Sequence, residues 1–151
     1  MDSTREAADL LTALAAAASS FRQAGYAIYL SHQTEVRWRQ FSHYGGEEGA
    51  PCASLGFTIA LQDGRELCVS ATVAVNGQGF SVAADATIDD ASSEPQGEQR
   101  FLIDLPDAAV ATVPECVTVL RDYVEQLTLA APGLVREALL GPKPDADAAP
   151  V

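Results

Sequence analysis

The chain has 151 residues, 48% of them hydrophobic and 20% charged, a composition that suits one globular domain and excludes an intrinsically disordered chain. A net charge of −12 repels phosphate backbones and anionic lipid surfaces, so we expect neither nucleic acid nor a membrane as a partner. The same charge attracts a basic protein or peptide, although high acidity also serves solubility alone.

The cysteines and the first segment of the chain bear on localisation. Cys52, Cys68 and Cys116 form no CxxC pair, which favours reduced thiols over a disulfide framework. The apolar stretch 10–18 imitates the core of a signal peptide, but three acidic residues and one arginine precede it, whereas a secretory leader begins with positive charge. We therefore expect a cytoplasmic protein.

Residues 3–25 carry the pattern of an amphipathic helix. Ser3 followed by Glu6 is a capping box, in which two side chains satisfy free N–H groups at a helix start. The apolar residues that follow recur at steps of three and four: Ala7, Leu10, Leu11, Leu14, Ala17, Ala18 and Phe21. Gly25 stands where a left-handed C-cap would end this helix.

After Gly25 the hydrophobic period changes to two, which is typical of strands with one buried face. The predicted strands are 26–30, 34–41, 55–61, 67–75, 80–88 and 100–105, with a loop over 44–51 and a stop at Pro106. Asp63-Gly64 and Asn76-Gly77 are typical of type I′ hairpin turns. The pattern predicts an antiparallel meander of about five to six strands, followed by an acidic loop over 89–98.

The C-terminal part predicts two helices. Thr112 and Glu115 repeat the capping box, and Pro114 suits the first helical turn. Pro132 is predicted to break this helix, and a shorter one follows over 133–140. We expect one α+β domain over 1–141, with its N-terminal helix and two C-terminal helices packed on one sheet face, and a disordered acidic tail over 142–151.

No motif of catalysis or metal binding emerges. His32 and His43 are the only histidines, no serine lies in a GxSxG elbow, and no HExxH is present. Cys52 lies nine residues after His43, a spacing that matches no nucleophile–base motif. The sequence therefore predicts no catalytic residue, no metal and no cofactor, and it favours a non-enzymatic protein.

Segment 35–44 is the densest basic and aromatic patch of this acidic chain. Strand alternation sends Val36 and Trp38 to one face and Arg37, Arg39 and Phe41 to the other. Because Trp, Tyr and Arg are enriched among binding hot spots, we predict a binding surface made of Arg37, Trp38, Arg39, His43, Tyr44, Glu47, Glu48, Asp89 and Asp90. The alternative is that Trp38 belongs to the core and that both arginines pair with local acids.

Three functional hypotheses follow. The first is a non-enzymatic protein that binds a basic protein or peptide, as an inhibitor, a toxin-neutralising immunity protein or a secretion chaperone does. The second is a small-molecule-binding protein or cofactor-free enzyme with a pocket between the curved sheet and the C-terminal helix. The third is an architectural homodimer that forms through a sheet face or edge. The predicted layout is similar to that of bacterial secretion chaperones, which is a likeness of arrangement alone.

Overall fold

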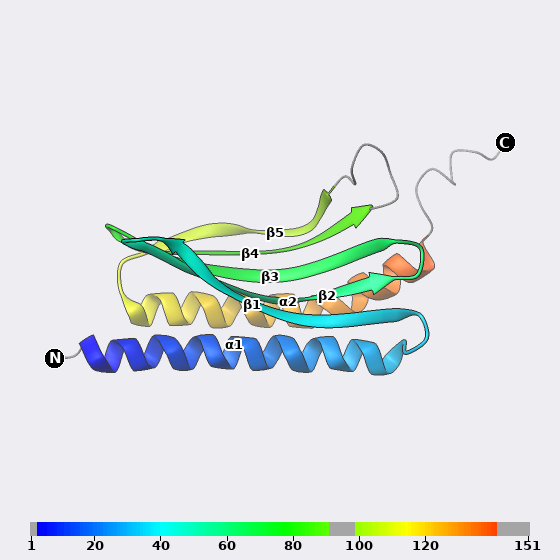
Figure 1. The fold of residues 1–151 in the computed structure, drawn as a ribbon, viewed down its shortest axis with the longest axis horizontal. Coiled ribbons are helices and arrows are strands. Elements are labelled where there is room, and N and C mark those ends of the chain that lie inside the picture. Colours follow the sequence, from blue (N-terminus) through cyan, green and yellow to red (C-terminus); the bar gives the residue numbers. More distant parts are fainter. Residues whose placement is uncertain (1–2, 91–98, 142–151) are drawn as a thin grey trace.

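The structure, a computed structural model, describes residues 3–90 and 99–141. Its elements are α1 (Ser3–Ser31), β1 (Val36–Glu47), β2 (Ala50–Leu61), β3 (Arg65–Asn76), β4 (Gly79–Asp90), β5 (Gln99–Val110) and α2 (Val113–Leu140). The five described strands form one antiparallel sheet in sequence order (Figure 1). This confirms the predicted α+β class and meander. The predicted tail 142–151 lies outside the described residues, as does 91–98 of the predicted acidic loop.

Both helices lie on the same face of the sheet and run side by side in the same direction (Figure 1). α1 packs against β1 and β2, while α2 packs against β3, β4 and β5. The core between the layers holds large side chains that are less than 2% exposed, among them Phe21, Phe57, Leu67, Leu120 and Leu127. Each stabilises the fold by about 1.5–3 kcal/mol, so both helices are needed to shield the sheet. Neither helix has an apolar stretch that could cross a membrane.

α1 is longer than the sequence pattern indicates, because Gly25 lies inside it and the predicted strand 26–30 is its last turns. A side chain at Gly25 would place its Cβ 2.6 Å from Cε3 of Trp38, so the glycine allows the helix to approach β1 closely. Phe21, Gly25 and Ile28 are all buried at helical steps of four and three. The predicted C-cap was wrong: Gly25 is a contact residue and does not end the helix.

The C-terminal region contains one helix, α2, where two were predicted. The capping box at its start is confirmed: the Glu115 N–H donates to Thr112 Oγ1 at 3.2 Å, and the Thr112 N–H donates to Glu115 Oε1 at 3.2 Å. The predicted break at Pro132 was wrong. Ala131 and Val135 on either side of it are 0% exposed. Their burial against the core keeps the helix continuous despite the hydrogen bond that the proline lacks.

β5 continues through Pro106 to Val110, so the predicted stop at this proline was also wrong. β5 is an edge strand, where a missing N–H on the free side costs nothing. Pro106 falls where the pairing with β4 shifts register between Val82 and Ala84. Its carbonyl accepts a hydrogen bond from the Tyr123 hydroxyl of α2, which fixes this part of the edge to the helix layer.

The β3–β4 turn lies one position after the predicted Asn76-Gly77, whereas the predicted Asp63-Gly64 lies within the β2–β3 connection. Asn76 pairs with Gly79, so the two-residue turn is 77–78. The β2–β3 connection is the three-residue loop 62–64, whose Gly64 has a φ of 97°. The predicted loop 44–51 is mostly paired strand, because β1 and β2 extend to a turn at 48–49. These turns set which residues stand opposite each other across the sheet.

Candidate functional site

The sheet face that points away from both helices, named the outer face, is the candidate site (Figure 1). Side chains alternate along each strand, so the outer face carries every second residue of the meander. Its central positions on β2 to β4 are small: Cys52, Ser54, Gly56, Thr58, Cys68, Ser70, Thr72, Ala74, Ser81 and Ala83. Ser54 and Thr72 join two of these strands through a hydroxyl–hydroxyl bond of 2.8 Å. A floor of such short side chains lets a partner backbone approach the sheet closely.

One half of the outer face is acidic. Cross-strand pairing places Asp85 of β4 opposite Asp104 of β5, and Glu66 of β3 opposite Asp89 of β4. These four residues and Asp107 are named the acidic cluster. Burial raises the pKa of Asp85, and the nearby charges of Asp104 and Asp107 raise it further. Like charges directly opposite each other destabilise a sheet, so the fold bears a cost at this position.

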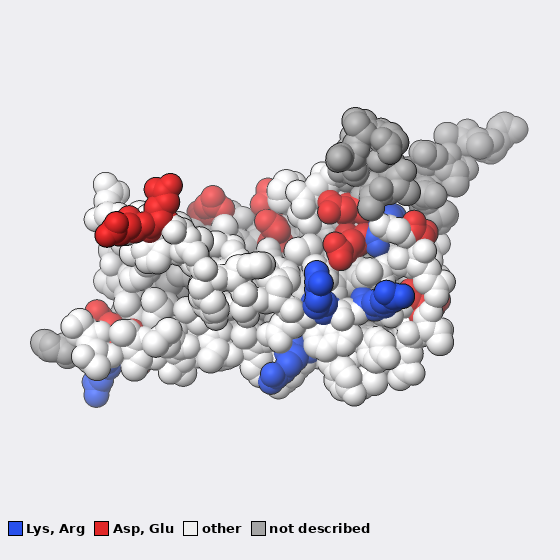
Figure 2. All heavy atoms as spheres, in the orientation of Figure 1, with Lys and Arg blue, Asp and Glu red and all other residues white. Residues whose placement is uncertain are grey.

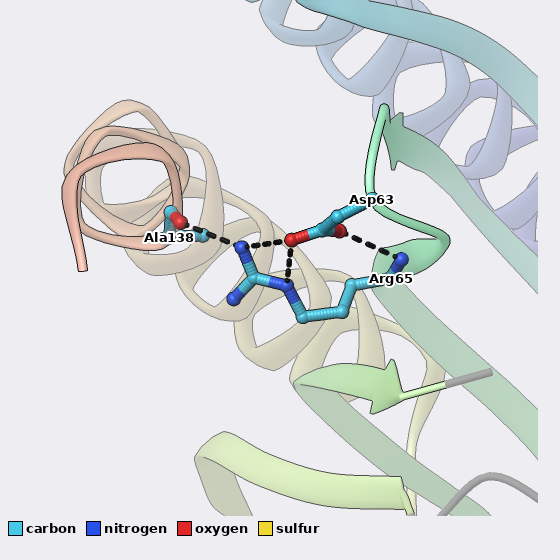
Figure 3. Close-up of polar contacts among 3 residues, drawn as sticks. All are labelled: Asp63, Arg65 and Ala138. Atoms are coloured by element: carbon cyan, nitrogen blue, oxygen red, sulfur yellow. Dashed lines mark hydrogen bonds and ion pairs between the residues drawn. The ribbon is translucent and has the colours of Figure 1, made fainter. Parts of the chain in front are cut away.

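No described arginine neutralises the acidic cluster through an ion pair, within residues 3–90 and 99–141. Arg65 lies at the start of β3 but is held elsewhere, as Figure 3 shows. Its Nη2 is 2.8 Å from Asp63 Oδ2 and donates to the Ala138 carbonyl of α2 at 2.9 Å. Arg65 therefore ties the β2–β3 loop to the last turns of α2, and its charge is already paired.

Cys68 lies on the outer face beside these acids. Burial, followed by the charges of Asp85, Glu66 and Asp89, raises the pKa of its thiol to about 11. Such a thiol stays protonated at neutral pH and is a poor nucleophile. Burial also raises the pKa of Cys116 in the core. The environment of these two cysteines therefore disfavours thiolate chemistry.

Three predicted binding residues, Arg37, Arg39 and His43, lie on the outer face along β1 and are named the basic strip. All three are exposed, and neither arginine forms an ion pair with a described acid. Phe41 shares this face: its ring packs 5.9 Å from that of His43, and its Cζ would lie 2.9 Å from a Cβ on Gly56. The predicted alternation along β1 is confirmed.

Trp38 and Tyr44 lie on the opposite side of β1, toward the helix layer. The Trp38 ring is half-buried and packs 6.2 Å from the ring of Tyr26 and against Gly25 of α1. Tyr44 is 67% exposed near the end of the strand. Trp38 therefore belongs to the contact between α1 and the sheet, and it does not share a surface with the basic strip.

The remaining predicted residues lie apart from the basic strip. Glu47 ends β1, and Glu48 occupies the turn to β2. Asp89 lies on β4, with β2 and β3 between it and the basic strip. Asp90 ends β4, and its side chain lies outside the described part of the structure. The structure thus divides the predicted surface among β1, its hairpin turn and the far half of the sheet.

Sequence reasoning did not select Asp85, Asp104 and Glu66, although each follows the alternation of its own strand. Alternation gives the face of a residue but not its neighbours on the next strand, which depend on the turn positions. The Glu66–Asp89 pair depends on the β3–β4 turn, which lies one residue after its predicted place, and the Asp85–Asp104 pair depends on the β4–β5 register, which contains two shifts. The cross-strand rows therefore could not be assembled from the sequence. On the side of the molecule that Figure 2 shows, most of the visible acidic side chains lie above most of the visible basic ones.

A groove of about 670 Å³ lies between the N-terminal halves of α1 and α2. Only helix residues line it, including Ala13 and Val117, with Arg121 and Glu125 among its charged residues. Within the described residues, no group of three or more His, Cys, Asp or Glu side chains could hold a metal ion. Between the sheet and α2, side chains such as Leu67 and Leu127 are 0–1% exposed and fill the core.

Comparison of the chain with protein-family models, with curated proteins and with solved structures found no match. The functional assignment therefore depends on the chemistry of the outer face itself.

Proposed function

We propose that this protein is a non-enzymatic binding protein whose outer face holds a basic segment of a partner protein. The observation that supports this most directly is the acidic cluster, because its carboxylates are brought together on a sheet face that neither helix covers. Asp85 carries a raised pKa in this cluster, so its charged form is disfavoured in the absence of a cation. A lysine or arginine of the partner that binds beside Asp85 stabilises the charged carboxylate and so removes the free-energy cost of its ionisation.

Arginine suits this site better than lysine. Asp85 and Asp104 stand directly opposite each other on neighbouring strands, and a planar guanidinium has enough N–H donors to reach both carboxylates. The partial burial of Asp85 also strengthens each charge-assisted hydrogen bond relative to one in open water. The net charge of −12 adds long-range attraction, which accelerates the encounter with a basic partner at low ionic strength.

The shape of the outer face fits an extended peptide. Small side chains such as Ser70 and Thr72 leave its middle flat, and Phe101, which is 56% exposed, stands on β5 opposite Thr87. An exposed aromatic ring beside carboxylates offers an apolar contact and a charged contact to the same partner segment. The proposed ligand is therefore a segment that combines arginines with apolar residues.

The proposal is tested with a labelled peptide of alternating arginine and valine, whose binding is followed by fluorescence anisotropy at low and high salt. The double variant Asp85→Asn/Asp104→Asn removes two charges from the outer face. Asp9→Asn/Asp122→Asn removes two charges from exposed positions on α1 and α2 and is the matched control. Both variants have the same net charge.

We expect the outer-face variant to bind the peptide about tenfold more weakly, since two charge-assisted contacts are lost. The helix-face control should lose less than about twofold, because only long-range attraction changes. Equal losses in the two variants would mean that the peptide responds to net charge alone, and the proposal would then be wrong.

A further inference from the structure

The two edges of the sheet differ in how they are protected. β5 carries Pro106, two shifts of register and the acidic residues Asp104 and Asp107, all of which hinder pairing with another strand. β1 pairs with β2 over twelve consecutive positions without a shift, and it contains no proline. No described strand lies beside its other edge. β1 therefore presents a long row of backbone groups to a further strand.

The sequence of β1 is complementary to itself when it pairs antiparallel about Ser42. In this register Arg37 stands opposite Glu47 of a second copy, and Glu47 opposite the second Arg37, on the outer face. Phe41 stands opposite His43 of the second copy, so the two ring pairs that already pack within each chain meet around the two-fold axis. A register shifted to centre on Phe41 would instead place Glu47 opposite Glu35, a like-charge pair.

α1 supports the same arrangement. Gln40 Nε2 donates to the Ala18 carbonyl at 2.9 Å, and Trp38 packs on Tyr26, so this flank of α1 follows the β1 edge. Leu11 lies on the same flank, two helical turns before Ala18, and is 66% exposed. Because α1 packs on both β1 and β2, pairing of two β1 strands brings the two α1 axes to about 10 Å, which is a helix-packing distance.

We propose that β1 is a dimerisation edge and that two copies of this chain join through antiparallel β1–β1 pairing into one continuous ten-stranded sheet. The two-fold axis passes at Ser42, and paired α1 helices line the seam beneath it. This inference goes beyond the proposed function and does not depend on it. The acidic cluster lies on β3 to β5, at the far side of each copy, and stays open in the dimer.

Charge reversal at the seam tests the proposal by sedimentation velocity over a series of protein concentrations. Glu47→Arg replaces two attractive pairs with two repulsive ones and should raise the dimer dissociation constant about tenfold. Arg37→Glu should do the same, and the double variant Arg37→Glu/Glu47→Arg should restore wild-type association. Glu125→Arg, with the same charge change at an exposed position on α2, which packs against β3, β4 and β5, should leave the dissociation constant unchanged.

A covalent probe keeps the test informative whatever the strength of association. Ser42→Cys places the new thiol beside its own copy at the axis, within reach of a disulfide, and mild oxidation should give a covalent dimer that the wild-type protein does not form. A wild-type protein that is monomeric at every accessible concentration, together with a Ser42→Cys variant that gives no covalent dimer on oxidation, would overturn the proposal, as would charge variants without rescue. Far-UV circular dichroism checks that each variant is folded. The Glu47→Arg variant should still bind the arginine–valine peptide, because its acidic cluster is unchanged. Peptide binding by this variant therefore distinguishes a failure of the dimer proposal from a failure of the proposed function.

Discussion

Replacement of Gly25 by alanine tests the close approach of α1 to the sheet. The new Cβ would lie 2.6 Å from Cε3 of Trp38 and 3.3 Å from Cδ2 of Phe57. Carbon atoms pack best at about 3.5–4.0 Å, so the overlap with the indole ring is close to 1 Å. Relief of such overpacking costs about 1–3 kcal/mol. Alanine also favours the helix by about 1 kcal/mol relative to glycine.

The net expectation for Gly25→Ala is a loss of about 1 kcal/mol in the free energy of unfolding, since the clash outweighs the helix propensity. In a Trp38→Ala background the ring is absent, so the same substitution should stabilise the protein by up to about 1 kcal/mol. The sign of the effect therefore reverses between the two backgrounds.

Urea denaturation of the four proteins in this cycle measures the effect. Far-UV circular dichroism is the suitable signal, because Trp38 is the only tryptophan and its fluorescence is lost in two of the variants. The interaction energy between Gly25→Ala and Trp38→Ala should be at least about 1 kcal/mol in magnitude. If Gly25→Ala changed stability equally in both backgrounds, the packing of Trp38 on the helix would not be the reason for this glycine.

Further predictions concern the cap, the acidic cluster and the core. Thr112→Ala should cost about 1 kcal/mol in chemical denaturation. Hydrogen bonds from backbone N–H groups lower the pKa of its partner Glu115. Glu115→Gln should therefore destabilise the folded protein at neutral pH. The stability difference between wild type and variant should vanish as the pH falls through the lowered pKa of Glu115. Asp85→Asn should raise the free energy of unfolding at pH 7, because the raised pKa of Asp85 means that the folded protein disfavours its charged form. Solvent screening limits this gain in stability to about 1 kcal/mol. The gain should fade as the pH falls below the pKa of Asp85 in the folded state. Leu127→Ala should cost about 2–5 kcal/mol in urea denaturation, whereas Leu129→Ala, at a 74% exposed position, should change stability by less than about 0.5 kcal/mol.

The sequence predicted the elements whose signals are local. Alternation along β3 and the capping box at Thr112 depend only on neighbouring residues, and both were confirmed. Gly25, Pro106 and Pro132 were misjudged for a common reason. Each residue type usually ends an element, but its effect here is set by contacts that are distant in sequence. Gly25 meets Trp38, Pro106 lies on a free sheet edge, and Pro132 is flanked by buried helix positions.

The candidate site could be predicted only in part. The sequence identified an acidic protein and a basic segment at β1, because these are properties of composition and of one strand. The acidic cluster needs residues from three strands: Glu66 meets Asp89 only once the β3–β4 register is known, and Asp85 meets Asp104 only once the β4–β5 register with its two shifts is known. A one-residue difference in a turn changes every cross-strand pair after it. The sequence could not supply this information without the turn geometry.

The proposed function requires that a basic peptide binds on the outer face. Two-dimensional amide NMR of the isotope-labelled protein, titrated with the arginine–valine peptide, measures this directly. We expect the largest shifts on outer-face residues of β3 to β5, such as Ser70, Asp85 and Asp104, while Thr12 and Thr118 in the groove between the helices stay unchanged. Shifts confined to that groove, or small shifts spread over the whole surface, would contradict the proposed function.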